Sequence, residues 1–221
     1  MSDVTSLIGE QVRVLLSGNQ LFNGVLTDVG FDIYVLFDGK RYYYIPQLHV
    51  HWIRQNSDVE EHVTKPDNSS FADELETISY RKILTHAKGS FAEIYVTGNL
   101  TFHGYITNVL NDYFVFYSPV FKTMFISLSH LKWLAPYHQN MTPYTLSHSS
   151  LPVLPNTMPM QRSLAEQLKK HEGELIVFDG GSNPMKIGLL KKVDNSIAEL
   201  SIANGESIFL QLQHIKSVHM P

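Results

Sequence analysis

Short runs of alternating apolar and polar residues recur along this chain and predict β-strands. Val12, Val14 and Leu16 alternate with Arg13 and Leu15, and a second run of the same kind spans residues 93–97. A period of two over a short run is typical of a strand with one buried face. Residues 31–37 and 113–117 are richer in apolar side chains, which is typical of a central, strongly bent strand. Gly-Asn and Asp-Gly pairs between the runs predict tight turns.

The whole pattern occurs three times at matched spacing. In each copy a glycine precedes an asparagine by ten positions, and that asparagine precedes a second glycine by five. The three sets are Gly9, Asn19 and Gly24; Gly89, Asn99 and Gly104; and Gly173, Asn183 and Gly188. The closing segments 48–53, 129–134 and 213–218 match as well. Such internal periodicity predicts three copies of one unit of five strands.

The closing segments supply the candidate contact positions. A histidine recurs in register in all three copies, and a tryptophan recurs in two of them. Together with the turn asparagines, the candidate set is His49, His130, His214, Asn19, Asn99, Asn183, Trp52 and Trp133. The recurring histidine is either a ligand or pH-sensitive contact, or a packing residue whose ring nitrogen satisfies a loop carbonyl. Packing is the favoured interpretation, because buried polar groups need partners.

A short amphipathic segment precedes each copy and predicts a helix. Ser2 or Asp3 is placed to cap a helix that holds Val4, Leu7 and Ile8. Ser79 is placed to cap one that holds Ile83, Leu84 and Ala87. Ser163, with Glu166 three residues later, has the spacing of a capping box for residues 164–171.

These boundaries predict three domains and two connectors. The domains are residues 1–55, 77–136 and 162–221. Residues 56–76 form an acidic polar linker, and residues 137–161 form a linker rich in Pro, Ser, Thr and Met. Both compositions are typical of extended connectors. The second linker also holds apolar residues such as Tyr144, Leu146 and Leu151, so part of it is a candidate to dock on a domain or a partner.

Residues 12–26, with their Gly-Asn turn and following Gly-x-hydrophobic step, resemble the Sm-like fold. The resemblance extends to all three copies but leaves out the linkers. It implies a mainly β protein of three tandem Sm-like or SH3-like five-stranded barrels, each with a short N-terminal helix. Residues 212–218 are also similar to Sm-like proteins of endospore-forming bacteria, some labelled spore coat proteins. In Sm-like folds, barrels join edge to edge through strand pairing.

The composition and charge of the chain exclude several classes of function. The chain has 221 residues, no cysteine and a formal net charge of −4. Disulfides, thiolate zinc sites and cysteine nucleophiles are therefore excluded. General nucleic-acid binders carry an excess of Lys and Arg, which is absent here. The beginning of the sequence lacks a basic start with an apolar stretch, and no apolar run would cross a bilayer, so we expect a soluble cytoplasmic protein without a membrane partner.

The RNA pocket of Sm-like proteins is not matched. The resemblance places its Asp on Gly30, Leu110 and Asp194, and its Asn on Tyr34, Phe114 and Ala198, so that no copy has both. No Arg-Gly pair follows in the last loop. The recurring histidine resembles that of a Lys-His pair in the bacterial RNA-chaperone branch, but Leu48, Ser129 and Gln213 stand at the lysine position. RNA or oligonucleotide binding is thus the alternative, and it is disfavoured.

Catalytic and metal-binding patterns are weak. No Gly-x-Ser-x-Gly elbow or phosphate-binding Gly-rich loop occurs. His49 and His51 would share one strand face as a metal pair, but Lys132 and Lys216 replace His51 in the other copies. We therefore predict no enzymatic activity, no cofactor and no metal. The predicted function is a structural or scaffold protein that self-associates or binds coat partners through barrel edges, with the spore coat as an alternative location to the cytoplasm.

Overall fold

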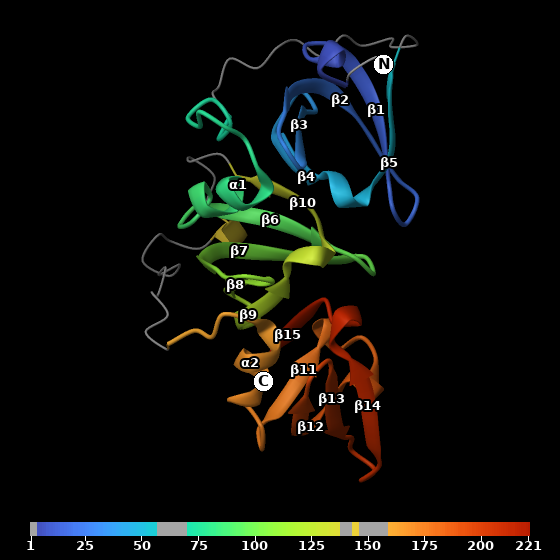
Figure 1. Cartoon of the computed structure of the whole chain (residues 1–221), viewed down its shortest axis with the longest axis vertical. Coiled ribbons are helices and arrows are strands. Elements are labelled where there is room, and N and C mark those ends of the chain that lie inside the picture. Colours follow the sequence, from blue (N-terminus) through green and yellow to red (C-terminus); the bar gives the residue numbers. More distant parts are fainter. Residues whose placement is uncertain (1–3, 57–69, 138–142, 146–158) are drawn as a thin grey trace.

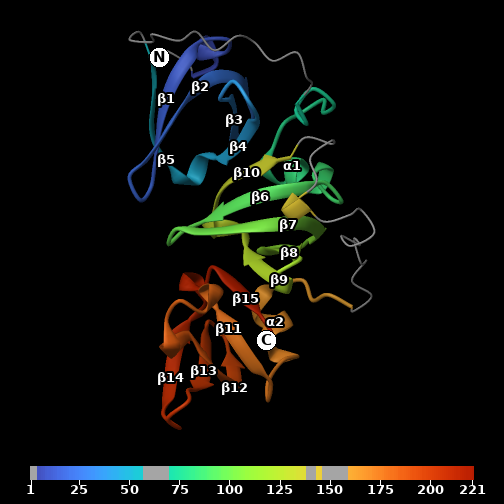
Figure 2. The same ribbon diagram turned by 180° about the vertical axis from the view of Figure 1, so that it is seen from behind.

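A computed structural model describes residues 4–56, 70–137, 143–145 and 159–221 of the chain. Its strands form one antiparallel sheet, in the order β14-β13-β12-β11-β15-β9-β8-β7-β6-β10-β4-β3-β2-β1-β5. The prediction of a mainly β protein is confirmed. Three groups of strands follow one another along the long axis (Figure 1), and the view from behind shows the same arrangement (Figure 2). Among the described residues, no helix has the length and apolarity needed to cross a membrane.

We call the three groups unit 1, unit 2 and unit 3, each of five strands. Unit 1 has η1 (Val4–Leu7), β1 (Gln11–Leu16), β2 (Gln20–Val29), β3 (Ile33–Phe37), β4 (Tyr42–Pro46), η2 (Gln47–His49) and β5 (Val50–Gln55). Unit 2 has α1 (Tyr80–His86), β6 (Phe91–Val96), β7 (Leu100–Val109), β8 (Tyr113–Ser118), β9 (Lys122–Ser127), η3 (Leu128–His130) and β10 (Leu131–Pro136).

Unit 3 has α2 (Leu164–Lys169), β11 (Leu175–Phe178), η6 (Asp179–Gly181), η7 (Pro184–Lys186), β12 (Ile187–Asp194), β13 (Ile197–Ser201), β14 (Ser207–Gln211), η8 (Leu212–His214) and β15 (Ser217–His219). A further short turn, η4 (Pro143–Thr145), lies between units 2 and 3 along the chain. Within each unit the first strand pairs with both the second and the fifth, and the second, third and fourth follow in order. The sheet therefore repeats one strand order three times.

The second glycine of each repeat allows the second strand to approach the third. A Cβ atom on Gly24 would lie 2.5 Å from the Phe37 carbonyl oxygen, and one on Gly104 would lie 2.1 Å from that of Tyr117. The register then shifts two residues later, between Leu26 and Asp28 in β2 and at the equivalent places in β7 and β12. A shift of this kind bends a strand. The glycine spacing read from the sequence thus marks the bend of each unit.

The helices at the starts of units 2 and 3 are capped as predicted. The Ser79 side chain accepts a hydrogen bond from the Lys82 amide, and the Ser163 side chain accepts one from the Glu166 amide. Unit 1 differs, because Val4–Leu7 forms only a 3-10 turn without a buried residue. A four-residue segment has too few backbone hydrogen bonds to hold an α-helix. The proposed caps Ser2 and Asp3 lie outside the described residues.

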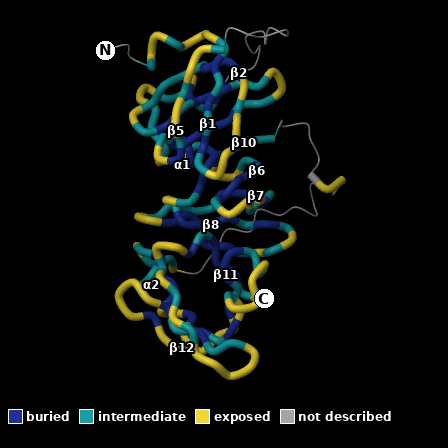
Figure 3. The backbone as a smooth tube through the Cα atoms, turned by 90° about the vertical axis from the view of Figure 1, so that its right-hand side faces the viewer, coloured by how far each residue is buried: buried dark blue, intermediate teal, exposed yellow. Residues whose placement is uncertain are grey.

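The buried side chains form three clusters, and each cluster contains residues from two neighbouring units. Ile33, Val35 and Tyr44 of unit 1 belong to the same buried cluster as the interior of unit 2. The described end of the first linker joins this cluster: the Phe71 ring stacks on Tyr44 at 5.4 Å, and Ala72 is 3% exposed. Leu75 also packs against this cluster, so the apolar side chains of residues 70–76 cover the junction between units 1 and 2. Figure 3 shows buried backbone in dark blue through all three units.

The remaining linker residues, 57–69, 138–142 and 146–158, lie outside the described part, including Leu146 and Leu151.

Candidate assembly interface at the seams between units

Two strand pairs join the units, and we call them seams. At the first seam β4 pairs with β10, with Tyr44 opposite Leu134. At the second seam β9 pairs with β15, with Phe125 opposite Val218, and the Ser127 amide donates to the Lys216 carbonyl at 3.0 Å. Pro46 stands at the position of Ser127 in the first seam and has no amide hydrogen to donate. This difference accounts for the shorter ladder there.

Trp133 anchors the first seam. It projects from β10 of unit 2, is 6% exposed, and packs edge-on against Tyr43 at 5.3 Å and Phe22 at 5.9 Å, both in unit 1. On its other side it stacks on Tyr95 of its own unit at 5.3 Å. Such aromatic pairs contribute about 0.5–1.5 kcal/mol beyond the burial of their area. The equivalent Trp52, on β5, is 38% exposed because no strand lies beyond β5 in the described structure.

His130 bridges the second seam. Its Nδ1 lies 2.8 Å from the Thr97 hydroxyl in its own unit, and its Nε2 lies 2.8 Å from the carbonyl oxygen of Gln213 in unit 3. Burial lowers the pKa of His130, and the Gln213 carbonyl offsets part of that effect. A carbonyl oxygen can only accept, so the Nε2 of His130 donates to the next unit. The carbonyl beside the ring nitrogen lies across a seam and not within the loop that holds the histidine.

His49 holds the equivalent place at the first seam. It is 8% exposed, and its Nδ1 lies 3.3 Å from the Ser17 hydroxyl. Burial and the positive charge of Lys132 lower its pKa, while the backbone of Ser129 raises it. Ser129 corresponds to Gln213, although the Nε2 of His49 makes no regular hydrogen bond with any described residue. The two rings thus face the same backbone position of the following unit.

His214 differs from both. It is exposed, and its Nε2 lies 3.4 Å from the side-chain nitrogen of its neighbour Gln213. Gly181 replaces the hydroxyl residue that holds the ring in units 1 and 2. In the described structure no strand pairs with β14 on the side away from β13, so the ring enters no seam.

Two lysines extend the seams along the same strands. Lys132 is 3% exposed, and its ammonium group donates to the Ser17 carbonyl at 2.5 Å, across the first seam. Burial lowers its pKa. Lys216 packs beside Gly98 across the second seam, where a Cβ atom would lie 3.2 Å from its side chain. In the sequence both lysines stand out only as replacements of His51. The structure places the side chain of each lysine across a seam.

Asp179 is the buried charge of unit 3. Its carboxylate accepts from the Lys216 amide at 2.8 Å and forms ion pairs with Lys186 and Lys216. Burial works against its ionisation, but the hydrogen bond from Lys186 and the charges of both lysines outweigh it and lower the pKa. The Asp179-Gly180-Gly181 segment is a 3-10 turn, and the carboxylate links this turn to the backbone of Lys216 and Ser217.

One aspartate in unit 1 and one in unit 2 each bind the helix of the following unit. Asp32 accepts from the Tyr80 amide at 2.7 Å, and Asp112 accepts from the Leu164 amide at 2.9 Å. Both carboxylates sit at the first turn of a helix, where negative charge is stabilising. The sequence analysis missed them. Their signal was the spacing, since each lies eight residues after Gly24 or Gly104, and Ser196 follows Gly188 at the same distance.

The three asparagines shape turns and do not form one site. Asn19 and Asn99 have φ angles of 60° and 61°, a left-handed conformation that asparagine tolerates. Asn183 has an ordinary φ of −116°, and its side chain accepts from the Met185 amide at 3.0 Å. Their recurrence in the sequence therefore reflects turn geometry in all three units.

Other predicted positions have structural surroundings. His49 is buried whereas His51 is exposed, and no group of His, Asp and Glu suited to a metal occurs in the described part of the chain. Phe114 is fully buried in the core, and Tyr34 packs against the core of unit 1. Tyr144 of the second linker is 49% exposed, with its ring 6.5 Å from that of Phe91.

Comparison with known proteins gives one family. The family model for the third domain of YwrJ matches residues 163–218. The chain is 47% identical over 225 residues to the protein named "Uncharacterized protein YwrJ" of Bacillus subtilis (strain 168), with both chains covered in full.

Proposed function

This chain belongs to the YwrJ family, and from its seams we propose that it is a non-enzymatic structural protein that assembles through the edges of its sheet. The observation that carries the proposal is that neighbouring units are joined by strand pairing. Within the part of the chain that the structure describes, the same sheet has an unpaired strand edge at each of its two ends. In the described residues β14 pairs only with β13, and β5 pairs only with β1. Exposed strand edges readily add another strand.

Each unit is, on this proposal, an Sm-like barrel. Three features support it: one repeated strand order, a bent second strand with its glycine, and a short helical segment before the first strand. Residues 212–218 resemble Sm-like proteins labelled as spore coat components, and the relative comes from Bacillus subtilis, an endospore-forming bacterium. A place in the spore coat is the setting that we propose for the assembly.

The test is the mass of the purified chain in solution. Size-exclusion chromatography with light scattering, run from low micromolar to several hundred micromolar protein, should show species larger than one chain. A strict monomer over the whole range would refute self-assembly. Fluorescence microscopy of a tagged chain in sporulating cells tests the coat setting, where an even cytoplasmic signal would contradict it.

RNA binding has less support. The amino groups of Lys132 and Lys216 already contact a carbonyl and a carboxylate, so they are engaged inside the protein. Phosphate contacts need cations that are free to replace counterions. A gel shift with oligo-U and oligo-A measures this directly, and salt-sensitive binding at micromolar protein would reverse the ranking.

A further inference from the structure

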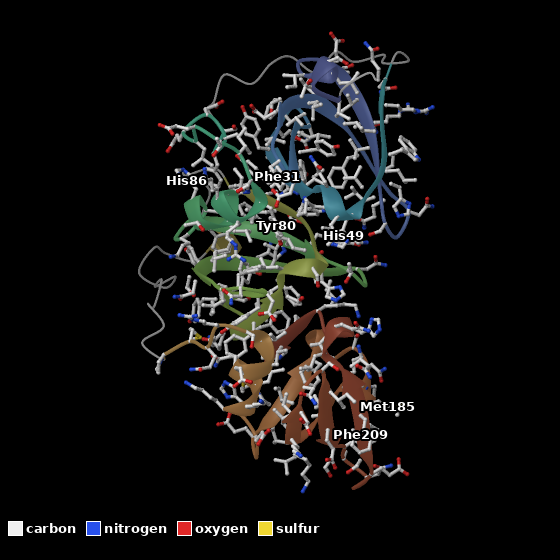
Figure 4. The ribbon with its side chains drawn as sticks, in the orientation of Figure 1. Phe31, His49, Tyr80, His86, Met185 and Phe209 are labelled. Atoms are coloured by element: carbon white, nitrogen blue, oxygen red, sulfur yellow. The ribbon has the colours of Figure 1, made fainter. Side chains whose placement is uncertain are left out.

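The two end strands expose side chains that are buried wherever a neighbouring unit is present. The residue five positions before the recurring histidine is aromatic in all three units. Tyr44 and Phe125 are each 2% exposed, whereas Phe209 on β14 is 67% exposed (Figure 4). A strand of the following unit lies beside each buried ring, β10 beside Tyr44 and β15 beside Phe125, and Phe71 of the first linker also stacks on Tyr44. Phe209 thus stands at the position of a seam residue, but no neighbouring unit of the described structure covers it.

The opposite end of the sheet, at β5, also exposes side chains whose equivalents in unit 2 are buried. On β5, Trp52 is 38% exposed and His51 is exposed, whereas the equivalent Trp133 and Lys132 on β10 are 6% and 3% exposed. Leu48, just before β5, is 72% exposed. The strand β5 is therefore the fifth strand of a unit that no strand of another unit covers in the described structure.

We propose that β14 of one chain pairs antiparallel with β5 of a second copy of the same chain and forms a third seam. This inference rests on the proposed assembly through sheet edges, and it names the partner and the register. A chain does not join its own two edges here, because β5 and β14 lie at opposite ends of the long axis (Figure 1). One edge of each kind on every chain gives a head-to-tail contact, which produces closed rings or open fibres.

The register follows from the two existing seams. In both, the residue four positions after the histidine lies opposite the residue five positions before the histidine of the preceding unit: Leu134 opposite Tyr44, and Val218 opposite Phe125. The same offset places Ile53 of the second copy opposite Phe209. Two residues further along, it places His51 opposite Gln211.

The recurring histidine gains its missing partner in this arrangement. His130 reaches the carbonyl of Gln213, the residue just before the next histidine. The corresponding carbonyl for His214 is that of Leu48 in the second copy, and the exposed ring of His214 is free of any seam in the single chain. The third seam lacks one contact, since Ser196 stands where Asp32 and Asp112 cap the next helix. It is accordingly weaker than the two seams inside the chain.

Cysteine cross-linking tests the register, since the chain has no cysteine of its own. Gln211→Cys and His51→Cys are made in separate chains, and both positions are exposed, so folding should be unaffected. After mixing and mild oxidation, a disulfide-linked pair of one chain of each variant is expected, because directly opposed residues lie within disulfide reach. The matched control is Gln211→Cys with Arg54→Cys, which is three residues out of register and exposed.

Cross-linking of the control pair as fast as the test pair, or no cross-linking of either pair, would overturn the proposed seam. If light scattering shows assemblies while the test pair fails to cross-link, edge assembly stands and this partner and register are wrong. A second variant, Phe209→Glu, should at least halve the assembled fraction by placing an unpaired charge in the seam. Its control, Leu175→Glu, alters a 59% exposed residue on the interior strand β11 and should leave assembly unchanged.

Discussion

Replacing Trp133 by alanine should destabilise the protein far more than the same change at Trp52. The two residues occupy equivalent strand positions, but Trp133 is 6% exposed and Trp52 is 38% exposed. A buried aromatic side chain removes roughly 150–250 Å² from water. At about 25 cal/mol per Å² this corresponds to about 4–6 kcal/mol. The unpaired buried Nε1 of Trp133 reduces its net contribution, so we expect a loss of about 3–5 kcal/mol, in the range of such truncations.

Trp52 lacks the covering strand, and its ring contact is a cation–π interaction with Arg54 at 5.3 Å. Its loss should cost about 1–2 kcal/mol, because much of its area is already in water. Urea unfolding followed by far-ultraviolet circular dichroism gives both free energies without relying on tryptophan fluorescence. The measurement is repeated at several low micromolar concentrations, and a free energy of unfolding that does not change with concentration shows that contacts between copies do not contribute.

Equal losses for the two variants would refute the reasoning that a seam buries Trp133. A double-mutant cycle with Phe22→Leu sharpens the test, since Phe22 belongs to unit 1 and its ring lies 5.9 Å from Trp133. The coupling free energy should be about 0.5–1.5 kcal/mol. A coupling of zero would mean that the units do not pack together at this seam in solution.

Three further predictions concern the tie between units 2 and 3, the buried charge and the titration of a histidine. Asp112→Ala removes the carboxylate that accepts from the Leu164 amide at the first turn of α2 and should cost about 1 kcal/mol in urea unfolding, whereas Ser196→Ala, at the equivalent place in unit 3, should cost less than about 0.5 kcal/mol. Asp179→Asn leaves two lysines without their buried counter-charge and should lower the free energy of unfolding by about 2–3 kcal/mol. The control Asp194→Asn removes an exposed ion pair and should change it by less than about 0.5 kcal/mol. Equal effects of the two variants would contradict the structure. Burial lowers the pKa of His49, so the unfolded chain binds its proton first as the pH falls below about 6.5, and stability declines there. His49→Gln should reduce the slope of stability between about pH 7.5 and about pH 5.5, and an unchanged slope would show that His49 is solvated.

The local elements could be predicted because their causes are local. Ser79 and Ser163 cap the helices that their positions indicate, since a cap needs only its own next three residues. The spacing of Gly24, Gly104 and Gly188 recurs because each must lie against a carbonyl of the adjacent strand. The first helix was the exception: Val4–Leu7 is a 3-10 turn, as its few residues bury no side chain.

The repeat, the alternation of side chains and the turn residues were thus determined by the sequence alone, as these depend on backbone preferences within a few residues. Which copy of a repeated residue is buried was decided only by the tertiary structure. Phe209 and Phe125 are the same residue type at equivalent positions, yet one is 67% exposed and the other 2%. The difference arises because β15, from another unit far along the chain, lies beside Phe125, whereas no strand of another unit pairs with β14 in the described structure. Pattern fixes the face that a side chain occupies, whereas burial of that face depends on the neighbour that covers it.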